Sequence, residues 1–428
     1  MMVRYGIILI VFLAACSPVS KSALNKKFKA LEESLQDHTG FMLYDLQKKE
    51  SLYEFQSNRY FTPASNTKTF TFYTALMVLG DSIPGLQYIE RGDSLIFRGT
   101  GDPSFLYSKA FDSRKVFDFL KLTDKQLFLV EDNFFTEPMG VGWAWDDYYY
   151  RFSSERSAFP IYGNFLTGDY NGQSLKVIPE FFAYQVSISD TTESTNIQRD
   201  VGSNKIQFSP GKLNQKKKWD IPFRTGTSIT AQLLSDTLKR KINLLDKIVW
   251  DSVRTLYSVP VDSMYKPIMQ PSDNFVAEQV LMICANVLSD SLKPEIAIDF
   301  MKKNYLNDLP DKPLWVDGSG LSRYNLFTPR SMVKLWEKIY ARVPQERLFS
   351  LTAVGGKTGT LKNAYKNTQP YIFAKSGTLS NNHNLSGFIV TKKGRILIFS
   401  FMNNNHPASS STVRDEMEKL LKSLYEHY

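Results

Sequence analysis

Residues typical of metal sites and of histidine-based catalytic centres are scarce in this 428-residue sequence. It has four histidines and two cysteines, and it contains neither an HExxH pattern nor paired His/Cys spacing, so it predicts no metal site. It also lacks the GxSxG element of Ser-His-Asp hydrolases and the glycine-rich loops that bind nucleotide phosphates. If the protein is an enzyme, we therefore expect its base to be a residue other than histidine, and we expect no cofactor.

Low-complexity segments and internal repeats are also lacking. With 43% hydrophobic and 22% charged residues, the composition is that of an ordinary globular protein, and the length allows two or three domains. The net charge of +9 is compatible with a solvated basic face, or with attraction to an anionic polymer or to carboxylate-bearing substrates. No basic run is interleaved with aromatic residues, so we expect no nucleic-acid partner.

The N-terminal segment has the pattern of a bacterial secretion signal. One arginine precedes an apolar run at 5–15, which is too short to span a bilayer and ends in small residues. The motif LAAC, ending at Cys16, resembles a lipobox, which implies cleavage before Cys16 and a lipid on its sulfur. A plain signal peptide cut nearby is the alternative. We expect a lipoprotein signal peptide at 1–15, a tether at 16–25, and an envelope protein anchored by its lipid, on the periplasmic face of the outer membrane.

Periodic patterns divide the remaining chain into a split domain and an insert. Strands are expected at 41–45 and 51–55, helices at 272–288, 328–343 and 411–428, and three further strands within 370–380, 384–394 and 395–404. The segment 63–80 fits either a buried helix or a strand. Strands near both chain ends predict one shared sheet, and short strand-like pieces between about 87 and 250 indicate a β-rich insert. We therefore expect an α+β protein with one domain at 26–84 and 256–428 and an insert at 85–255.

A serine can be activated by a lysine one helical turn away. Residues i and i+3 share a helix face, and a partly buried lysine is neutral often enough to accept a proton. Ser65 and Lys68 have this spacing and begin an almost uncharged segment, which predicts a buried helix. The unpaired N–H groups of its first turn can help hold an oxyanion. A simple helix-capping serine is the alternative.

Three other SxxK pairs occur, at Ser209/Lys212, Ser263/Lys266 and Ser331/Lys334. The first contains Pro210-Gly211 and is expected to form a turn. The second is followed by Pro267, so we expect no helix there. The third lies on a predicted helix at a position where Lys334 is expected to be exposed.

An SxN pattern occurs at Ser194, Ser272 and Ser380. Ser194 lies in a polar loop and Ser380 in a predicted hairpin connection. Ser272-Asp273-Asn274 directly precedes a long apolar helix, which makes it the candidate for catalysis. Because Ser, Asp and Asn are also common N-caps, a purely capping role stays open.

A Lys-hydroxyl-Gly sequence suits the edge of a sheet, where its backbone can pair with an extended peptide and glycine allows close approach. The chain contains it twice, as KTGTL from Lys357 and as KSGTL from Lys375. Lys357 follows two glycines and leads into a polar stretch, which is typical of a loop. Lys375 lies among strand-like segments. We therefore choose Lys375, Ser376 and Gly377, with the first copy as a glycine-rich loop nearby.

Together these motifs resemble those of penicillin-binding proteins and serine β-lactamases, the penicilloyl serine transferases. The SxxK, SxN and K[T/S]G motifs of that superfamily match, in order, Ser65-Asn66-Thr67-Lys68, Ser272-Asp273-Asn274 and Lys375-Ser376-Gly377. The long interval between the first two resembles the class C penicillin-binding proteins, the D-alanyl-D-alanine carboxypeptidase/endopeptidase family. GTGDPSF at 99–105, GWAWDD at 142–147 and DGSGLSRYN at 317–325 also resemble that family. Ser376 replaces the usual threonine, which keeps the hydroxyl, and the insert is somewhat compact.

The resemblance implies a β-lactamase/transpeptidase-like fold, in which helices flank an antiparallel sheet. It implies a serine peptidase that cleaves D-Ala-D-Ala, or D-Ala-diamino acid cross-links, in peptidoglycan stem peptides and is acylated by β-lactam antibiotics. Ser65 would form the acyl-enzyme and Lys68 would take its proton. Ser272 would relay a proton to the leaving group, and Asn274 would orient Lys68 and the substrate.

The resemblance also implies substrate-binding residues. Lys375 and Ser376, beside Gly377, would hold the terminal carboxylate. The backbone N–H groups of Ser65 and Thr378 would form the oxyanion hole, and Thr378 would share the carboxylate. Asp147, in GWAWDD, is the candidate for contacting the amine of the stem-peptide diamino acid. The DGSGLS stretch is expected to be a structural loop under the site.

Three other functions are compatible with such a fold. A β-lactamase would need a water-activating carboxylate, as in ExxLN, and that pattern is absent. A non-catalytic, peptidoglycan-binding envelope lipoprotein or an esterase would keep the fold and change the chemistry. All three motifs are chemically intact, which favours the peptidase.

Overall fold

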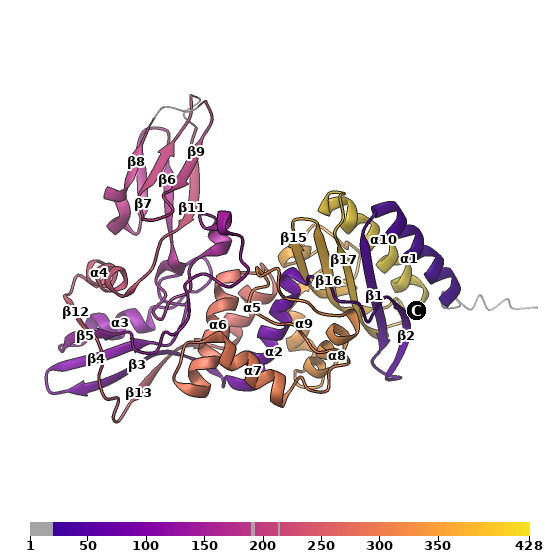
Figure 1. Cartoon of the computed structure of the whole chain (residues 1–428), viewed down its shortest axis with the longest axis horizontal. Coiled ribbons are helices and arrows are strands. Elements are labelled where there is room, and N and C mark those ends of the chain that lie inside the picture. The colour runs from indigo at the N-terminus through magenta and orange to yellow at the C-terminus, as the bar shows by residue number, and fades with distance from the viewer. Residues whose placement is uncertain (1–19, 190–192, 213–214) are drawn as a thin grey trace, which may run out of the picture.

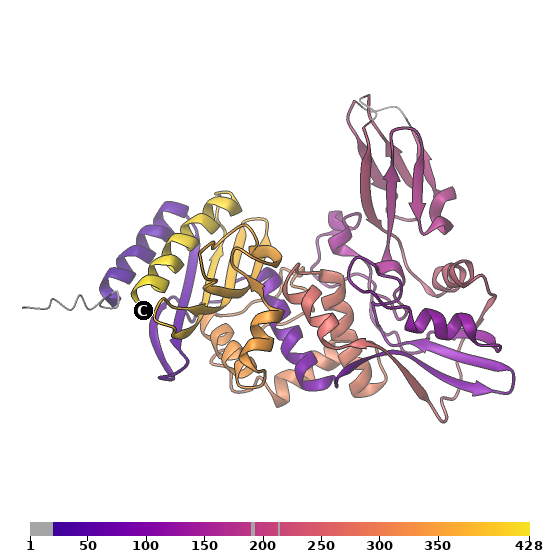
Figure 2. The same cartoon turned by 180° about the vertical axis from the view of Figure 1, so that it is seen from behind.

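A computed structural model describes residues 20–189, 193–212 and 215–428. The described chain forms two lobes, one containing both chain ends and the other built from the middle of the chain (Figures 1 and 2). The predicted signal peptide 1–15, the lipidation site Cys16 and the first residues of the predicted tether lie outside the described residues.

An antiparallel sheet of six strands unites the two ends of the chain. In sheet order its strands are β14 (Ala353–Val354), β15 (Ile372–Leu379), β16 (Asn382–Val390), β17 (Ile396–Asn404), β1 (His38–Asp45) and β2 (Glu50–Phe55). Phe41 of β1 pairs with Phe401 of β17, so the N-terminal hairpin lies directly against the last strand. The predicted sheet of N- and C-terminal segments is confirmed.

Helices α1 (Lys21–Leu35) and α10 (Ser410–His427) cover one face of this sheet (Figure 1). Apolar residues of α1 recur at helical spacing, and the ring of Phe28 packs on the rings of Phe41 and Phe401. The tether predicted at 16–25 therefore extends too far at its C-terminal end, because α1 begins at Lys21. Residues from Lys21 onward are helical because their apolar stripe covers an apolar sheet face.

The opposite face packs against a group of helices that shares one core with it. These helices are α2 (Lys68–Val78), α5 (Asp262–Met269), α6 (Asn274–Ser289), α7 (Pro294–Asn304), α8 (Pro329–Tyr340) and α9 (Gln345–Leu351). The ambiguous segment 63–80 forms a 3₁₀ turn, Ala64–Thr67, followed by α2. Cys284, on α6, is buried, and burial raises the pKa of its thiol, which agrees with an inert cysteine.

Helix α5 contradicts the expectation that Pro267 excludes a helix around Lys266. A proline inside a helix costs about 3 kcal/mol, because one backbone hydrogen bond is lost. Met264, Tyr265 and Ile268 of α5 are buried in the core, and each such side chain stabilises the fold by about 1.5–3 kcal/mol. Tertiary burial therefore outweighs the local penalty.

The insert contains a five-stranded mixed sheet with two helices and a protruding β-rich part (Figure 1). In order, the five strands are β12 (Ile242–Leu245), β5 (Gln126–Val130), β4 (Ser94–Gly99), β3 (Ser82–Arg91) and β13 (Arg254–Pro260). The helices are α3 (Lys115–Leu122) and α4 (Thr227–Leu238). Since β3 and β13 pair with each other, the chain enters and leaves the insert side by side.

The protruding part consists of two three-stranded sheets. One has the order β11 (Lys217–Pro222), β6 (Phe165–Tyr170) and β7 (Leu175–Ile178), and the other has the order β8 (Val186–Ile188), β10 (Ile206–Ser209) and β9 (Asn196–Arg199). The predicted β-rich insert between the SxxK and SxN motifs is confirmed.

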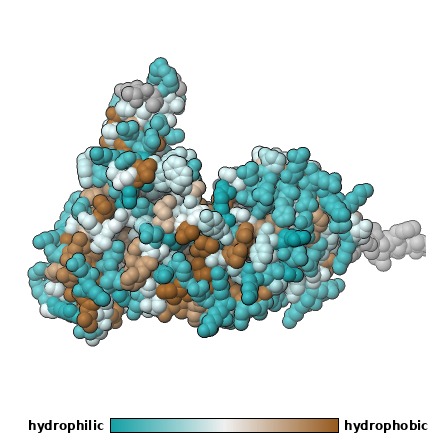
Figure 3. Space-filling view, viewed as in Figure 1, coloured by the Kyte–Doolittle hydropathy of each residue, from teal (hydrophilic) through white to brown (hydrophobic). Residues whose placement is uncertain are grey.

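Hydrophilic and apolar residues are unevenly distributed over the surface shown in Figure 3. The end formed by α1 and α10 is mostly hydrophilic, whereas apolar residues gather over the middle of the face shown in Figure 3. Within the described ranges, no single helix is long and apolar enough to cross a membrane, and only α6 and α7, bent by 74° at their junction, pass that test as a pair.

Candidate active site

Ser65 lies on a strained turn directly before α2. Ala64 has a positive φ of 48°, which is uncommon for a residue with a side chain. Two glycines touch this turn: a Cβ atom on Gly377 would lie 2.5 Å from the carbonyl oxygen of Pro63, and one on Gly320 would lie 1.9 Å from that of Ala64. Only glycine fits at these positions, so strand β15 and the loop around Gly320 can both approach Ser65. Ser65 itself is half-buried.

The amine of Lys68 is enclosed by three acceptors. Lys68 is fully buried, and its Nζ lies 2.8 Å from Ser65 Oγ, 2.6 Å from Asn274 Oδ1 and 2.6 Å from the carbonyl oxygen of Ser319. Burial lowers the pKa of this amine to about 8, although carboxylates nearby, the first being Asp317, raise it. At pH 7 about a tenth of the molecules therefore carry a neutral amine.

The three acceptors also orient the neutral form of Lys68. A neutral amine has one lone pair and two N–H groups. Asn274 Oδ1 and the Ser319 carbonyl oxygen can act only as acceptors, so they accept hydrogen bonds from the two N–H groups. The lone pair then faces the Ser65 hydroxyl, which is the geometry that a general base requires.

The SxN motif divides two tasks among neighbouring residues. Asp273 is the N-cap of α6 and accepts a hydrogen bond from a backbone N–H of the first turn, at 3.0 Å. Ser272 has a positive φ of 66°, and its Oγ accepts a hydrogen bond from Lys375 Nζ at 2.8 Å. Asn274 contacts Lys68. The capping role and the contact with both lysines therefore coexist.

Lys375 is the second buried amine of the site. It has no exposed surface, and its Nζ donates to Ser272 Oγ at 2.8 Å and to the carbonyl oxygen of Ser376 at 2.7 Å. Burial lowers the pKa of the Lys375 amine well below its usual range, and the charge of Lys68 lowers it further. The two amines together therefore bind fewer protons than two lysines in water.

The first copy of the repeated motif supports the second. Lys357 is exposed in a loop, as predicted, while Thr360 Oγ1 lies 2.6 Å from Ser376 Oγ. The N–H of Thr360 donates to the carbonyl oxygen of Gln270 at 3.0 Å, close to the SxN motif. Thr360 was missed as a site residue, although the duplicated sequence was the signal that could have pointed to it.

Strand β15 offers an edge for an extended peptide. Among the described strands, β14 pairs only with Phe373 and Ala374, so from Lys375 onward this edge of β15 has no strand partner. Thr378 is exposed there, and its Oγ1 lies 2.8 Å from His383 Nδ1 on β16. A bound peptide could pair with this edge as an added strand.

A cavity of about 480 Å³ adjoins the SxN motif on the side of the insert. Ser272 and Asn274 line it together with insert residues that include Tyr150, Arg151, Phe152 and Asp220. Among the described residues, Asp147 is not part of this lining. It lies three positions before Tyr150 on the 3₁₀ turn Trp145–Asp147, where burial and Asp146 raise the pKa of its carboxyl group.

The loop that begins at Asp317 lies under the site, as expected for DGSGLS. Asp317 accepts hydrogen bonds from the N–H groups of Gly320, at 2.8 Å, and Ser322, at 2.7 Å. The Ser319 carbonyl contact with Lys68 was not predicted, because a backbone atom leaves no trace in a residue pattern. In the part of the chain that is described, no group of three His, Cys, Asp or Glu side chains could hold a metal ion.

The fold and the convergence of SxxK, SxN and KSG define a serine peptidase of the penicillin-binding type. The sequence model of the D-Ala-D-Ala carboxypeptidase 3 (S13) family matches residues 22–424. The chain therefore belongs to this family and is a penicillin-binding serine DD-peptidase.

Known proteins resemble it over most of its length. D-alanyl-D-alanine carboxypeptidase DacB of Haemophilus influenzae is 24% identical over 91% of this chain and 90% of that protein. The D-alanyl-D-alanine carboxypeptidase of an Actinomadura species is 24% identical over 86% of this chain and 78% of that protein. The crystal structure of penicillin-binding protein 4 from Haemophilus influenzae superposes with a TM-score of 0.74 at 21% identity, covering 93% of this chain and 99% of that one.

The burial of Lys68 predicts a pH dependence for acylation. Because only the neutral amine accepts the serine proton, the second-order rate of acylation by a fluorescent penicillin should rise about tenfold per pH unit below about pH 8 and then level off. Labelling rates measured from about pH 6 to about pH 9 check this, with circular dichroism at each pH as the control for folding. A rate that is flat over this range contradicts the assignment of Lys68.

Proposed function

We propose that Ser65 attacks the carbonyl carbon of the penultimate D-alanine of a stem peptide and forms an acyl-enzyme, which water then hydrolyses. The observation that carries this proposal is the contact of Lys68 Nζ with Ser65 Oγ inside a buried set of acceptors. Among the four SxxK pairs, Lys68 is the fully buried lysine; Lys212 and Lys266 are exposed and Lys334 is partly exposed. The same serine would be acylated by β-lactam antibiotics.

The second lysine makes substrate binding and base formation interdependent. The terminal carboxylate of the substrate binds beside Lys375, Ser376 and the exposed Thr378, and it favours the charged form of the Lys375 amine. A full charge on Lys375 disfavours a charge on Lys68, since each lowers the proton affinity of the other. Substrate binding and the protonation of the two lysines are therefore coupled.

Four groups of the site act on the tetrahedral intermediate or on the substrate amide. The backbone N–H groups of Ser65 and Thr378 donate hydrogen bonds to the oxyanion. Each such donor typically stabilises the transition state by about 3 kcal/mol. Ser272 Oγ accepts a hydrogen bond from Lys375, so its own hydroxyl proton is available to the leaving amine. Asn274, fixed between Lys68 and the carbonyl oxygen of Phe152, positions the substrate amide.

Substitutions of Ser65 and of the lysine in each copy of the repeated motif test this assignment. Ser65→Ala should abolish covalent labelling by a fluorescent penicillin, and Lys375→Ala should slow it by a factor of at least about 100, because the carboxylate loses its cation. Lys357→Ala, the matched control in the exposed first copy, should label at the wild-type rate. The proposal is wrong if Ser65→Ala still forms the adduct, or if Lys357→Ala is the slow variant.

The substrate bond can be distinguished by its products. Digestion of purified sacculi, followed by mass spectrometry, shows lost D-alanine for carboxypeptidase activity and split cross-linked dimers for endopeptidase activity. A predatory peptidoglycan endopeptidase from Bdellovibrio bacteriovorus has the same fold, with a TM-score of 0.55 at 14% identity over 91% of this chain and 92% of that one. This favours measuring both products.

We propose that Asp147 binds the side-chain amine of the stem-peptide diamino acid. Asp220, unlike Asp147, lines the cavity next to the SxN motif, but it is already paired with Lys109 and accepts a hydrogen bond from Thr167 at 2.7 Å. Asp147 is partly exposed, so its carboxyl group is accessible to a substrate amine; burial and Asp146 raise its pKa, and Arg323 lowers it.

Asp147→Asn should raise the KM for a stem peptide with a free side-chain amine about tenfold, because one charge-assisted contact is lost. The KM for the N-acetylated analogue should not change. Asp220→Asn is the matched control and should affect both substrates equally. If Asp220→Asn raised the KM only for the peptide with the free amine, and Asp147→Asn left that KM unchanged, the amine would bind Asp220 and not Asp147.

We further propose that the mature protein begins at Cys16 and is anchored by lipid in the cell envelope, on the periplasmic face of the outer membrane. The lipobox sequence supports this, and so does a peptidoglycan substrate, which lies outside the cytoplasm. Helix α1 starts at Lys21, so a short segment joins the anchor to the folded protein.

Cys16→Ser should release the protein from the membrane fraction and abolish incorporation of labelled palmitate, since the acyl acceptor is lost. Cys284→Ser is the control: this thiol is fully buried, and the variant should keep both lipid and location. A Cys16→Ser protein that still carries lipid and sediments with membranes contradicts the anchor.

A further inference from the structure

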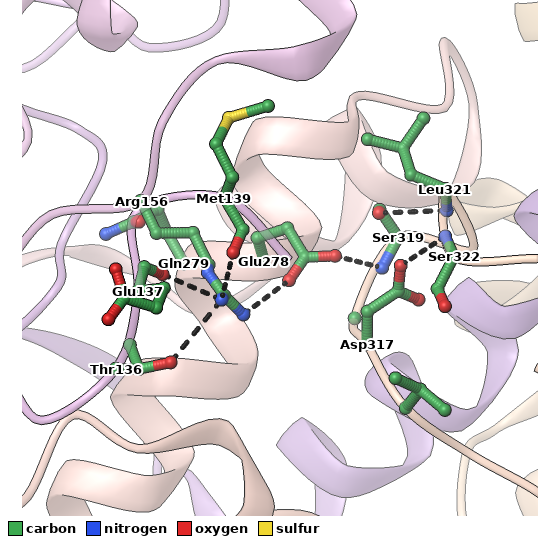
Figure 4. A network of polar contacts seen from close by, with 12 residues as sticks. Thr136, Glu137, Met139, Arg156, Glu278, Gln279, Asp317, Ser319, Leu321 and Ser322 are labelled. Atoms are coloured by element: carbon green, nitrogen blue, oxygen red, sulfur yellow. Dashed lines mark hydrogen bonds and ion pairs between the residues drawn. The ribbon is translucent and has the colours of Figure 1, made fainter. Parts of the chain in front are cut away.

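A buried pair of opposite charges lies one contact away from the proposed base. Glu278 follows Asn274 by one turn of α6 and has no exposed surface, while Arg156 comes from the insert and is 4% exposed. Glu278 Oε2 lies 3.6 Å from Arg156 Nη1 (Figure 4). None of the roles described above uses this pair, although burying two charges is costly.

Glu278 holds the residue that orients Lys68. Its Oε1 accepts a hydrogen bond from the N–H of Ser319 at 2.7 Å (Figure 4). The carbonyl oxygen of the same residue accepts from Lys68 Nζ at 2.6 Å. Ser319 is thus fixed on one side by Glu278 and contacts the base on the other, so a rotation of its backbone would remove one of the three acceptors of Lys68.

Arg156 is fixed in turn by backbone of the insert. Its Nη2 donates to the carbonyl oxygens of Glu137, at 2.8 Å, and Met139, at 3.3 Å (Figure 4). A second insert residue, Trp143, donates through Nε1 to Asp317 Oδ2 at 3.0 Å. The insert therefore contacts both acidic groups that lie beneath the base.

The charges around Lys68 set its proton affinity. Asp317 and Glu278 raise the pKa of Lys68 against the effect of burial, as Asp273 also does. Burial raises the pKa of the Glu278 carboxyl group, Asp317 raises it further, and Arg156 opposes both. The cation of Arg156 thus favours the ionised form of Glu278, which in turn favours the protonated form of Lys68.

We infer that Glu278 and Arg156 are positioning residues of the general base, through which the insert holds the Ser319 carbonyl against Lys68 and sets the basicity of that lysine. The inference rests on the proposed role of Lys68. It assigns to the insert a part in acylation itself, in addition to any contact with substrate.

Glu278→Gln tests the inference. The amide oxygen can still accept from Ser319, but the negative charge is lost and the Arg156 cation is unbalanced. The rising limb of the acylation pH profile should therefore move to lower pH, and the limiting rate should fall about tenfold because a weaker base is used. The affinity for the penicillin before acylation should not change. Rates are expressed per site titrated with the fluorescent penicillin, so misfolded protein does not contribute.

Two further variants separate positioning from stability. Arg156→Lys keeps the cation but loses the forked contacts with Glu137 and Met139, and its rising limb should stay at the wild-type pH. Asp132→Asn removes a charge from another ion pair with little exposed surface, in which Asp132 Oδ1 lies 3.3 Å from Arg98 Nη1. It should lower the melting temperature without moving the limb.

The inference is overturned if the acylation rate of Glu278→Gln rises over the same pH range as that of wild type. It is also overturned if Arg156→Lys and Asp132→Asn shift this pH range as far as Glu278→Gln does. Failure of the underlying function is recognised separately, since Ser65→Ala would then still be labelled. If Ser65→Ala is not labelled and the limb of Glu278→Gln is unmoved, only the role of the charge pair is refuted.

Discussion

The burial of one lysine amine is the constraint on which the rest of this structure depends. Lys68 is in a site without solvent contact, where an ammonium group is stable only with a full set of acceptors. Those acceptors come from three separate parts of the chain: the Ser65 turn, the start of α6 and the loop around Ser319. A better-solvated lysine would keep a pKa near 10.4 and would rarely be neutral at pH 7, whereas fewer acceptors would leave a buried charge uncompensated. Burial and acceptors must therefore be balanced, and this balance ties the distant motifs together.

The insert acts on this balance from outside the catalytic lobe. The carbonyl oxygen of Phe152 accepts a hydrogen bond from the side-chain amide of Asn274. Trp143 donates a hydrogen bond to Asp317, and Arg156 forms an ion pair with Glu278. Each insert group touches a residue of the split domain that in turn contacts, or lies close to, Lys68. Since β3 and β13 pair where the chain leaves and re-enters that domain, the insert is attached as one unit. Its placement and the electrostatics around Lys68 are therefore physically linked.

The general fold and the convergence of the motifs could be predicted because they depend on local features. Period-two segments near both termini indicated the shared sheet, and context selected Lys375 over Lys357 and Ser65 over its competitors. The errors have tertiary causes. Helix α5 tolerates Pro267 because its neighbours are buried, and α1 was overlooked because its apolar stripe gains stability only against the sheet. Thr360, Glu278 and the Ser319 carbonyl act through contacts between remote segments, which no local pattern in one sequence reveals.

The position of β1 has a consequence for the order in which the catalytic lobe can form as the chain is synthesised. This strand lies between β2 and β17, so its hydrogen-bonding groups on one side have no partner until residues 396–404 have been synthesised. Ser65 leaves the ribosome early, whereas the strand bearing Lys375 is among the last segments to emerge. A nascent or truncated polypeptide would therefore carry Ser65 without Lys375, the residue that we propose binds the substrate carboxylate. The complete six-stranded sheet, and with it the juxtaposition of Ser65 and Lys375, therefore requires the C-terminal strands.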